Sequence, residues 1–380
     1  MPSRKIEIVV ATPAHASMLH DFFRSVWPSE SSALRESGAD DPRPSEAYRP
    51  EDALSIIAVE SDRVIGYLGT LPLRLWDGRR EQRGHWFKGF MVLPEFRNGP
   101  IGYGLVKEAV KHVPVGLVVT VQPASWRLFK AMGMSHLGAL ENRVRLLDSE
   151  HVLSAIDIGQ LGLPGLPAAA VRGVKVLQRL GVAKLAGATA NIGLAGWSLA
   201  FGSRSRGVKT GVSTGIDYRE YDTLWANART TLNFSEVRDG EYVQSRYART
   251  DASPYTLFEA RDGVDLVGFA ALRSPSRAAD PRLSGLTVAI LSDLLVSALR
   301  TDAMFSLLAS VEKAAREVGA DALVCSASHP KLLGALGARG YLRIPSTLQF
   351  LSRLPDGSRG TASVRDWWLL RSDGNADEGF

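Results

Sequence analysis

The chain has 380 residues, of which 45% are hydrophobic and 22% charged, and its formal net charge is +5. These values exclude a disordered chain, and the length is typical of two domains. The 36 glycines and 19 prolines show no collagen-like period, which excludes a fibre. The one cysteine, Cys325, excludes an internal disulfide and a cysteine-cluster zinc site, and it indicates a reducing, cytoplasmic setting. A charge this mild does not indicate a nucleic-acid partner, and it suits an anionic small ligand equally well.

Hydrophobic periodicity in the first 150 residues predicts alternating strands and helices. The expected elements are a strand at 6–10, a helix capped by Thr12, a hairpin of 56–60 and 64–76, a strand at 84–93, a helix at 101–113, a buried strand at 115–121, and a short helix with final strands through Leu147. Short helices between strands, around one central sheet, are typical of an α/β fold with a mixed sheet.

Two later stretches raise the question of a membrane. Residues 185–203 carry no charge and are about as long as a membrane span, but glycine and alanine make them weakly apolar. We expect a segment packed between domains. The basic amphipathic pattern at 172–180 predicts a docked linker helix, with peripheral membrane contact as the alternative.

Three sequence markers recur in the same order with nearly constant spacing. Gly66 and Gly268 are 202 positions apart, and the pairs Pro123 and Pro330, and Gly133 and Gly340, are each 207 apart. Similar residues surround each member of a pair. We therefore expect two copies of one fold, at 1–148 and 208–380, joined by a helical, Gly/Ala-rich segment at 149–207.

Several glycines lie in and just after the connection between the strand at 84–93 and the helix at 101–113. Bare N–H groups and the positive end of a helix dipole suit a phosphate, and Arg97 adds a formal charge. The alternative is a turn that only starts a helix. The residues we expect to line a phosphate-bearing ligand are Met91, Val92, Arg97, Asn98, Gly99, Pro100, Ile101, Gly102, Tyr103 and Gly104.

This stretch resembles the acetyl-CoA signature of the GNAT acetyltransferase superfamily, Val-x-Pro-x-x-Arg-x-x-Gly-x-Gly/Ala, through Val92, Pro94, Arg97 and Gly102. The resemblance implies two tandem GNAT-like acyl-CoA N-acyltransferase domains, with acetyl-CoA or another acyl-CoA as co-substrate and a small amine as acceptor. The closing run 367–377 resembles tandem GNAT proteins of bacterial exopolysaccharide biosynthesis, which implies an amino sugar. No metal is expected, because the seven histidines lack ligand spacing.

Three positions depart from the family pattern. Pro100 replaces a glycine and removes one N–H donor, and Phe129 stands where many members have a proton-donating tyrosine. The strand before the loop lacks the usual glutamate. His85 is the first candidate for the general base, because its ordinary pKa lies near 6.5, and Glu60 is the second. The alternative is that both are ordinary surface residues or residues with satisfied hydrogen bonds.

The second copy lacks the glycine loop. Residues 294–305 contain no glycine, and Asp302 at a helix start would repel pyrophosphate, so this copy is expected to be degenerate and to bind no CoA. Its expected part is to build the acceptor cleft or to stabilise the first copy. Asp293 lies in an apolar strand and needs a buried partner.

The predicted function is acyl transfer from CoA to an amine. One alternative is a non-catalytic degenerate pair that binds a ligand or partner, and another is an aminoacyl-tRNA-dependent transferase, which would not need the loop. Acidic residues at 28–52 are expected to form a solvated loop, with steering of a cationic acceptor as the alternative. The sequence does not determine the oligomeric state.

Overall fold

The computed structural model describes residues 5–26, 53–120, 122–155, 207–247, 254–278, 283–355 and 363–375. The acidic loop at 28–52, the basic stretch at 172–180 and the uncharged stretch at 185–203 lie outside these residues. The chain forms two compact units. Unit 1 comprises residues 1–75, 81–138 and 349–362, and unit 2 comprises residues 76–80, 139–348 and 363–380.

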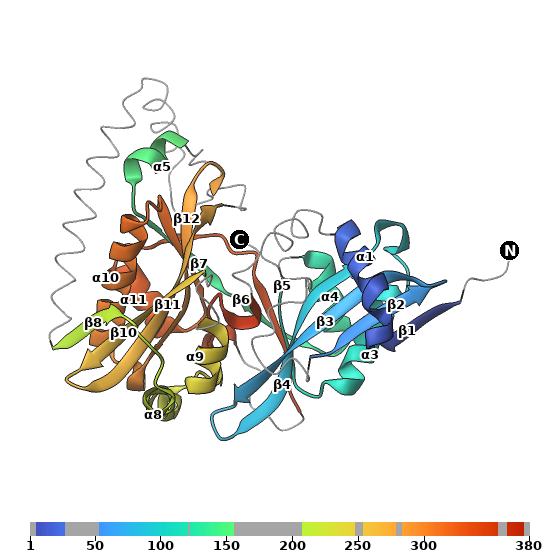
Figure 1. Ribbon diagram of the computed structural model, residues 1–380, viewed down its shortest axis with the longest axis horizontal. Helices are drawn as coiled ribbons and strands as arrows, with labels where there is room; N and C mark the ends of the chain where they lie inside the picture. Colours follow the sequence, from blue (N-terminus) through green and yellow to red (C-terminus); the bar gives the residue numbers. More distant parts are fainter. Residues whose placement is uncertain are drawn as a thin grey trace. The chain divides into compact units, whose positions relative to one another are not determined.

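Unit 1 is built on a mixed sheet whose strands run in the order β1-β2-β3-β4-β5-β15-β6 (Figure 1). The strands are β1 (Ile6–Val10), β2 (Ser55–Glu60), β3 (Arg63–Trp76), β4 (Glu81–Val92), β5 (Gly116–Thr120), β6 (Ser135–Ala139) and β15 (Gln349–Arg353). The helices are α1 (Ala16–Val26), α3 (Ile101–His112) and α4 (Pro123–Ala131), with 3-10 turns at Pro13–His15 and Pro94–Phe96. The elements predicted in this part of the sequence are present, with small shifts at their ends.

Neighbouring residues of β3 show which helix covers which face of this sheet. A Cβ added to Gly66 would lie 3.0 Å from Leu105 of α3, so Gly66 faces that helix. The next residue, Tyr67, packs its ring edge-on against Phe23 of α1, with 4.8 Å between ring centroids. Because successive strand residues point to opposite faces, α1 and α3 cover opposite sides of the sheet.

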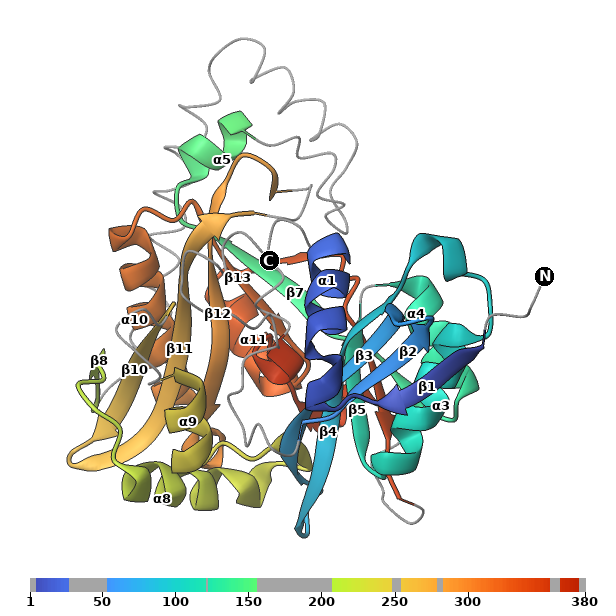
Figure 2. The same ribbon diagram turned by 45° about the vertical axis from the view of Figure 1, so that its right-hand side comes forward.

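Unit 2 has a second mixed sheet, in the order β14-β7-β13-β12-β11-β10-β8 (Figure 2). Its strands are β7 (Glu141–Leu146), β8 (Val208–Val212), β10 (Tyr255–Asp262), β11 (Asp265–Arg277), β12 (Thr287–Val296), β13 (Ala322–Ala327) and β14 (Leu342–Ile344). Two short strands, β9 (Phe234–Glu236) and β16 (Trp367–Trp368), pair in parallel. The helices are α5 (Ser149–Ala155), α8 (Tyr218–Ala228), α9 (Gly240–Tyr247), α10 (Thr301–Glu317) and α11 (Pro330–Ala338), with 3-10 turns at Arg229–Thr231, Ser297–Leu299, Val364–Asp366 and Asp373–Asn375.

The glycine–aromatic pair of β3 has a counterpart in β11. A Cβ on Gly268 would lie 3.1 Å from Leu307 of α10, while the Phe269 ring packs against Tyr221 of α8 at 5.7 Å. As in unit 1, a glycine lets a helix approach one face of the strand closely, and the aromatic residue that follows it packs on the opposite face. The glycine and aromatic markers thus mark equivalent positions in two copies of one fold.

The later markers also coincide. Pro123 and Pro330 each occupy the first position of a nine-residue helix, α4 and α11, where proline loses no hydrogen bond. Gly133 and Gly340 each follow that helix with φ of +86° and +80°, a backbone conformation that favours glycine. The predicted two-copy organisation is therefore confirmed.

The two sheets exchange a strand. The final strands through Leu147 were expected to close the first copy, but β7 pairs with β13 and β14 of the second sheet. In return β15 pairs antiparallel with β5 of the first sheet, with Phe350 opposite Val119. The predicted boundaries 1–148, 149–207 and 208–380 remain a proposal, because β7 belongs to the second sheet and β15 to the first.

Helix length sets one further limit. No helix among the described residues is long and apolar enough to cross a membrane. The longest, α10, has 17 residues and buries one face against the second sheet, with Met304, Leu307 and Val311 all at most 1% exposed.

Candidate active site

The loop between β4 and α3 lies exposed at the carboxyl end of β4. From Arg97 to Pro100 all four residues are exposed, and Asn98 has a φ of +67°. Asparagine tolerates this left-handed conformation better than most residues, and an Asn-Gly pair is a common turn signal. The turn leads the backbone into α3, whose N-cap is Pro100.

Several N–H groups at this helix start are open. The first helical bond is made by the Gly104 N–H to the Pro100 carbonyl at 2.9 Å. The N–H groups of Ile101, Gly102 and Tyr103 therefore precede the hydrogen-bonded part of the helix and point out of its end. No side chain caps them. Together with the positive end of the helix dipole, they can bind an anion.

Two of the expected ligand contacts are used inside the protein. The Arg97 N–H donates to the Pro94 carbonyl at 3.2 Å, and Arg97 Nε donates to the Val92 carbonyl at 2.9 Å. The Arg97 guanidinium also approaches Met91 Sδ at 3.6 Å, so this side chain turns back along the end of β4. Its positive charge stays beside the loop.

The glycines of α3 are needed for close packing. A Cβ on Gly102 would come within 3.1 Å of the Phe90 ring and 3.3 Å of Leu128, and one on Gly104 would come within 2.2 Å of Ile8. The helix start can therefore approach β1 and β4 closely. Tyr103, on the outer side, is 48% exposed.

Strands β4 and β5 run in parallel and separate towards the loop. Among the described residues, their paired positions are His85 with Gly116 and Trp86 with Leu117. Farther along β4, Gly89 has a φ of +64°, which interrupts the regular strand. The diverging strands and the open helix start lie at the carboxyl ends of a parallel pair, where α/β sheets bind ligands.

Three phenyl rings fill the core beside these strands. Phe129 stacks on Phe87 with 5.7 Å between centroids and meets Phe90 edge-on at 5.8 Å. Phe129, at the position expected to hold a proton-donating tyrosine, is only 1% exposed. It therefore serves as a core residue.

His85 lies where β4 and β5 are still paired. Its Nδ1 is 2.9 Å from Thr70 Oγ1, and that hydroxyl oxygen also accepts the Leu54 N–H at 2.9 Å. For Nε2 to act as a base, Nδ1 must carry the hydrogen and donate it to Thr70. Thr70 is 3% exposed, so it fixes one side of the imidazole.

Glu60 lies at the other end of the sheet. It ends β2 opposite Arg63, the first residue of β3, and the Leu93 N–H donates to the Ile65 carbonyl nearby. Glu60 therefore shares the end of the sheet that carries the loop. His85 lies seven residues back along β4, about 23 Å at the usual strand rise. The structure does not bring the two candidate bases together.

Sequence reasoning missed Thr70 and the conformation of Asn98. The Asn-Gly pair at 98–99 was a readable turn signal. Thr70 carries no such signal, because its role depends on β3 lying beside β4.

In unit 2 the equivalent turn is closed by side chains. Arg300 binds Asp302 through its Nε and terminal nitrogens, at 3.1 and 2.5 Å, and Asp262 at 2.7 Å. These bonds to Arg300, together with backbone N–H groups at the start of α10, hold the pKa of Asp302 below its ordinary value. A carboxylate thus already occupies this helix start, which agrees with the expected loss of the anion site.

No cluster of three or more histidine, cysteine or acidic side chains suited to a metal ion occurs within the ranges the structure describes.

Comparison with known proteins finds a family model that matches part of the first unit. The model of the Acetyltransferase (GNAT) family matches residues 16–134, a range that runs from α1 to just beyond α4 and includes the open loop. No curated protein sequence matches the chain.

Solved structures share the fold over most of the chain. A GCN5-related N-acetyltransferase from Anabaena variabilis aligns with a TM-score of 0.55 and 11% identity, covering 91% of this chain and 72% of that one. One from Kribbella flavida has a TM-score of 0.53, 12% identity and coverage of 93% and 72%. Saccharomyces cerevisiae N-myristoyltransferase with bound myristoyl-CoA has a TM-score of 0.55, 11% identity and coverage of 97% and 86%.

Proposed function

Because residues 16–134 form a domain of the GNAT acetyltransferase family, we propose that the chain transfers an acetyl or related acyl group from CoA to a small amine. The observation that carries this proposal is the uncapped start of α3, where the N–H groups of Ile101, Gly102 and Tyr103 face outward. A pyrophosphate there would accept these hydrogen bonds and complement the helix dipole. We further propose an amino sugar as acceptor and a cytoplasmic location.

The long arm of acyl-CoA separates its pyrophosphate from its thioester. With the pyrophosphate at the loop, we propose that the arm lies along the diverging β4 and β5 and brings the thioester towards the paired end of these strands. That end carries His85, whereas Glu60 lies beside the loop. This geometry favours His85 as the base.

The reaction then needs few groups from the protein. The amine nitrogen attacks the thioester carbonyl, a C–N bond forms, the C–S bond breaks, and the thiolate leaves with CoA. Strand N–H groups near Gly89 are our candidates for polarising the carbonyl. His85 would take the proton that the ammonium must lose, directly or through water. A CoA thiolate is a weak enough base to leave without a dedicated acid, so Phe129 does not prevent turnover.

Binding is tested by calorimetric titration of acetyl-CoA into wild type, Gly102→Asp and Gly102→Asn. Both substitutions crowd Phe90 equally, but only Asp places a negative charge at the helix start, as Asp302 does in unit 2. We expect Asp to weaken binding at least about tenfold more than Asn. Equal losses would remove the loop from the binding site.

Turnover is tested by thiol release with a panel of amines that includes glucosamine. His85→Gln should lower kcat by about 10²- to 10⁴-fold, as expected for loss of a general base, with a much smaller change in KM. Thr70→Val should shift the pH profile of kcat, and Thr70→Ser should restore it, because serine keeps the hydroxyl beside Nδ1. A His85→Gln enzyme with wild-type kcat would exclude His85 as the base.

The buried Phe129 favours a second candidate, a pair of domains that binds acyl-CoA or another ligand without turnover. Tight binding of acetyl-CoA without thiol release from any amine would support it. Absence of binding in folded wild type would reopen the alternative of an aminoacyl-tRNA-dependent transferase.

A further inference from the structure

The second sheet contains the same diverging pair of parallel strands as the first. Strands β12 and β13 pair from Val288 with Ala322 to Ile290 with Val324. Beyond Ile290, β12 continues for six residues without a further pairing to β13 among the described positions. Buried peptide groups on the facing edges of these strands need other partners.

The segment 367–373 supplies those partners to both strands. On the β12 side, the Ser372 N–H donates to the Ser292 carbonyl at 2.9 Å, and Trp368 Nε1 donates to the Leu294 carbonyl at 2.9 Å. On the other side, Ser328, just beyond β13, donates its N–H to the Leu369 carbonyl at 3.2 Å. The Leu369 N–H donates to Ser328 Oγ at 3.0 Å. The segment therefore lies in the slot between the diverging strands.

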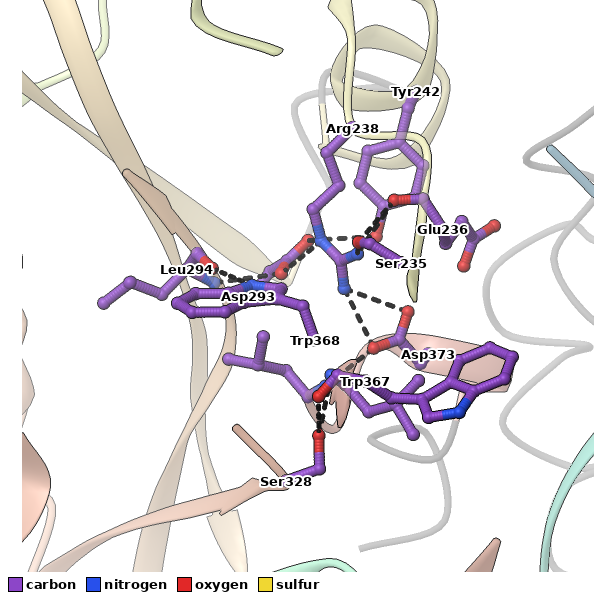
Figure 3. A network of polar contacts seen from close by, with 12 residues as sticks. Ser235, Glu236, Arg238, Tyr242, Asp293, Leu294, Ser328, Trp367, Trp368 and Asp373 are labelled. Carbon is purple, nitrogen blue, oxygen red and sulfur yellow. Dashed lines mark hydrogen bonds and ion pairs between the residues drawn. The ribbon is translucent and has the colours of Figure 1, made fainter. Parts of the chain in front are cut away.

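The segment is part of the core. Every residue from Trp367 to Asp373 is at most 6% exposed. Figure 3 shows Trp368 beside Leu294 and the backbone of the segment close to Ser328. Its two tryptophans and two leucines are at most 1% exposed, so water does not reach these apolar side chains.

A buried ion network holds the end of the segment. Arg238 donates through Nε to Asp293 at 2.9 Å and through a terminal nitrogen to Asp373 at 2.9 Å, and all three side chains are fully buried (Figure 3). The hydroxyls of Tyr242 and Tyr247 donate to Asp293 at 2.9 and 3.0 Å. The expectation that Asp293 has a buried partner is confirmed.

Charge balance explains why Arg238 stays protonated there. Burial disfavours its charge, but the carboxylates of Asp293 and Asp373 outweigh that effect and hold its pKa well above the ordinary value. Removing the arginine would leave two buried carboxylates without a cation. The network thus ties the segment to β12.

We propose that residues 367–373 are a permanent internal occupant of the ligand slot in unit 2. The slot corresponds to the place between β4 and β5 that the proposed function assigns to acyl-CoA, and Asp302 closes the helix start beside it. Each chain therefore takes one acyl-CoA, in unit 1. Only this count rests on the proposed function; the occupancy of the slot does not.

Cys325 is a built-in probe of the slot. It is the one cysteine of the chain, it lies on β13, and it is fully buried. Burial raises the pKa of its thiol to about 12, with Arg371 and Asp293 within electrostatic range. We expect a thiol reagent to reach Cys325 when the segment leaves the slot, so that the rate of its reaction with DTNB measures this opening.

The test compares two tryptophan-to-phenylalanine variants of the full chain. Trp368→Phe removes the hydrogen bond to the Leu294 carbonyl. Trp225→Phe is the matched control, because Trp225 is 3% exposed in α8 and its Nε1 has no partner among the described atoms. We expect Trp368→Phe to speed the Cys325 reaction by roughly tenfold, as loss of one buried hydrogen bond predicts. The control should change it much less.

Hydrogen exchange of wild type gives a second readout that needs no variant. Amides of 367–373 should exchange at least about 1,000-fold more slowly than in an unfolded chain, with or without acetyl-CoA. The proposal is overturned if these amides exchange like an exposed loop, if Trp368→Phe reacts no faster than Trp225→Phe, or if two acetyl-CoA molecules bind each chain. The first two readouts do not involve acyl-CoA, so they stand even if the proposed function fails.

Discussion

The turns that follow β4 and β12 occupy equivalent places in two copies of one fold, yet they end in opposite states. After β4, the N–H groups at the start of α3 are open and the loop is exposed. After β12, the carboxylate of Asp302 occupies the start of α10, clamped by Arg300. The two helix starts therefore differ in their side-chain chemistry: the first has no side-chain cap, and the second already holds a carboxylate.

Backbone shape does not account for the difference. Without any glycine, Ala298 and Leu299 take φ values of 41° and 56°, so the second turn also enters the left-handed region. In the first turn Asn98 does so at 67°. The absence of glycine at 294–305 therefore does not prevent the bend. What distinguishes the second turn is the Arg300–Asp302 pair at its helix start.

The largest expected effect is a loss of stability when the buried ion network beside β12 is broken. Arg238→Met leaves Asp293 and Asp373 without their cation in a fully buried site. We expect the free energy of unfolding to fall by about 3–5 kcal/mol, measured by urea denaturation. Arg277→Met, at an exposed position of β11, is the control and should change it by less than about 0.5 kcal/mol. A wild-type stability for Arg238→Met would mean that the network does not hold the segment.

A smaller effect concerns the two left-handed turns. Ala298 is exposed, and alanine is strained at its positive φ, so Ala298→Gly should stabilise the chain by about 0.5–1 kcal/mol. Asn98→Gly should change stability by only a few tenths, because asparagine already tolerates this conformation. Thermal unfolding of both variants checks the difference. If both were destabilised equally, strain would not distinguish the turns.

The smallest effect is a pH dependence at Asp302. Arg300 lowers the pKa of Asp302 in the folded state below its ordinary 3.8, so this pair stabilises the chain above that pH. The stabilisation is lost as the pH falls through the lowered value. Asp302→Asn should therefore cost up to about 1 kcal/mol at pH 7 and progressively less as the pH falls below 3.8.

Urea unfolding of wild type and Asp302→Asn, at pH 7 and at a pH below 3.8, measures the difference in their free energies of unfolding. Added salt should also shrink it, because the side chains of Arg300 and Asp302 are 32% and 27% exposed. A gap that widened in acid would contradict the assignment of the carboxylate as the charged partner.

Local patterns in the sequence predicted much of the fold. Periodicity gave the strands and helices of unit 1, because each element shows its buried face in its own residues. The repeat was readable because Gly66 and Gly268 fill the same kind of close contact with a helix. The glycine loop after β4 could also be predicted, because a turn that starts a helix is formed by residues adjacent in the sequence.

What escaped prediction depends on partners far apart in the chain. The two carboxylates that Arg238 binds lie 55 and 135 residues away in the sequence, and local sequence patterns do not indicate contacts over such separations. The same holds for Thr70, whose hydroxyl lies beside His85 of a neighbouring strand, and for β7, where Leu146 pairs with the distant Ala322 of β13. In the candidate site, sequence indicated which side chains could act, whereas only tertiary structure showed that Glu60 lies at the end of the sheet that carries the loop and His85 lies farther back, within β4.

The exchange of β7 and β15 has a consequence for synthesis on the ribosome. Strand β5 is made early, but its neighbour β15 ends at Arg353, so the ladder from Val118 to Leu351 must wait for more than 200 further residues to emerge. Until then, that edge of the nascent sheet offers unpaired backbone groups to other chains. Pairings of such long range also fold slowly. Completion of the first sheet is therefore a late step, and a nascent chain that stalls before Gln349 carries an open strand edge that invites chaperones or aggregation.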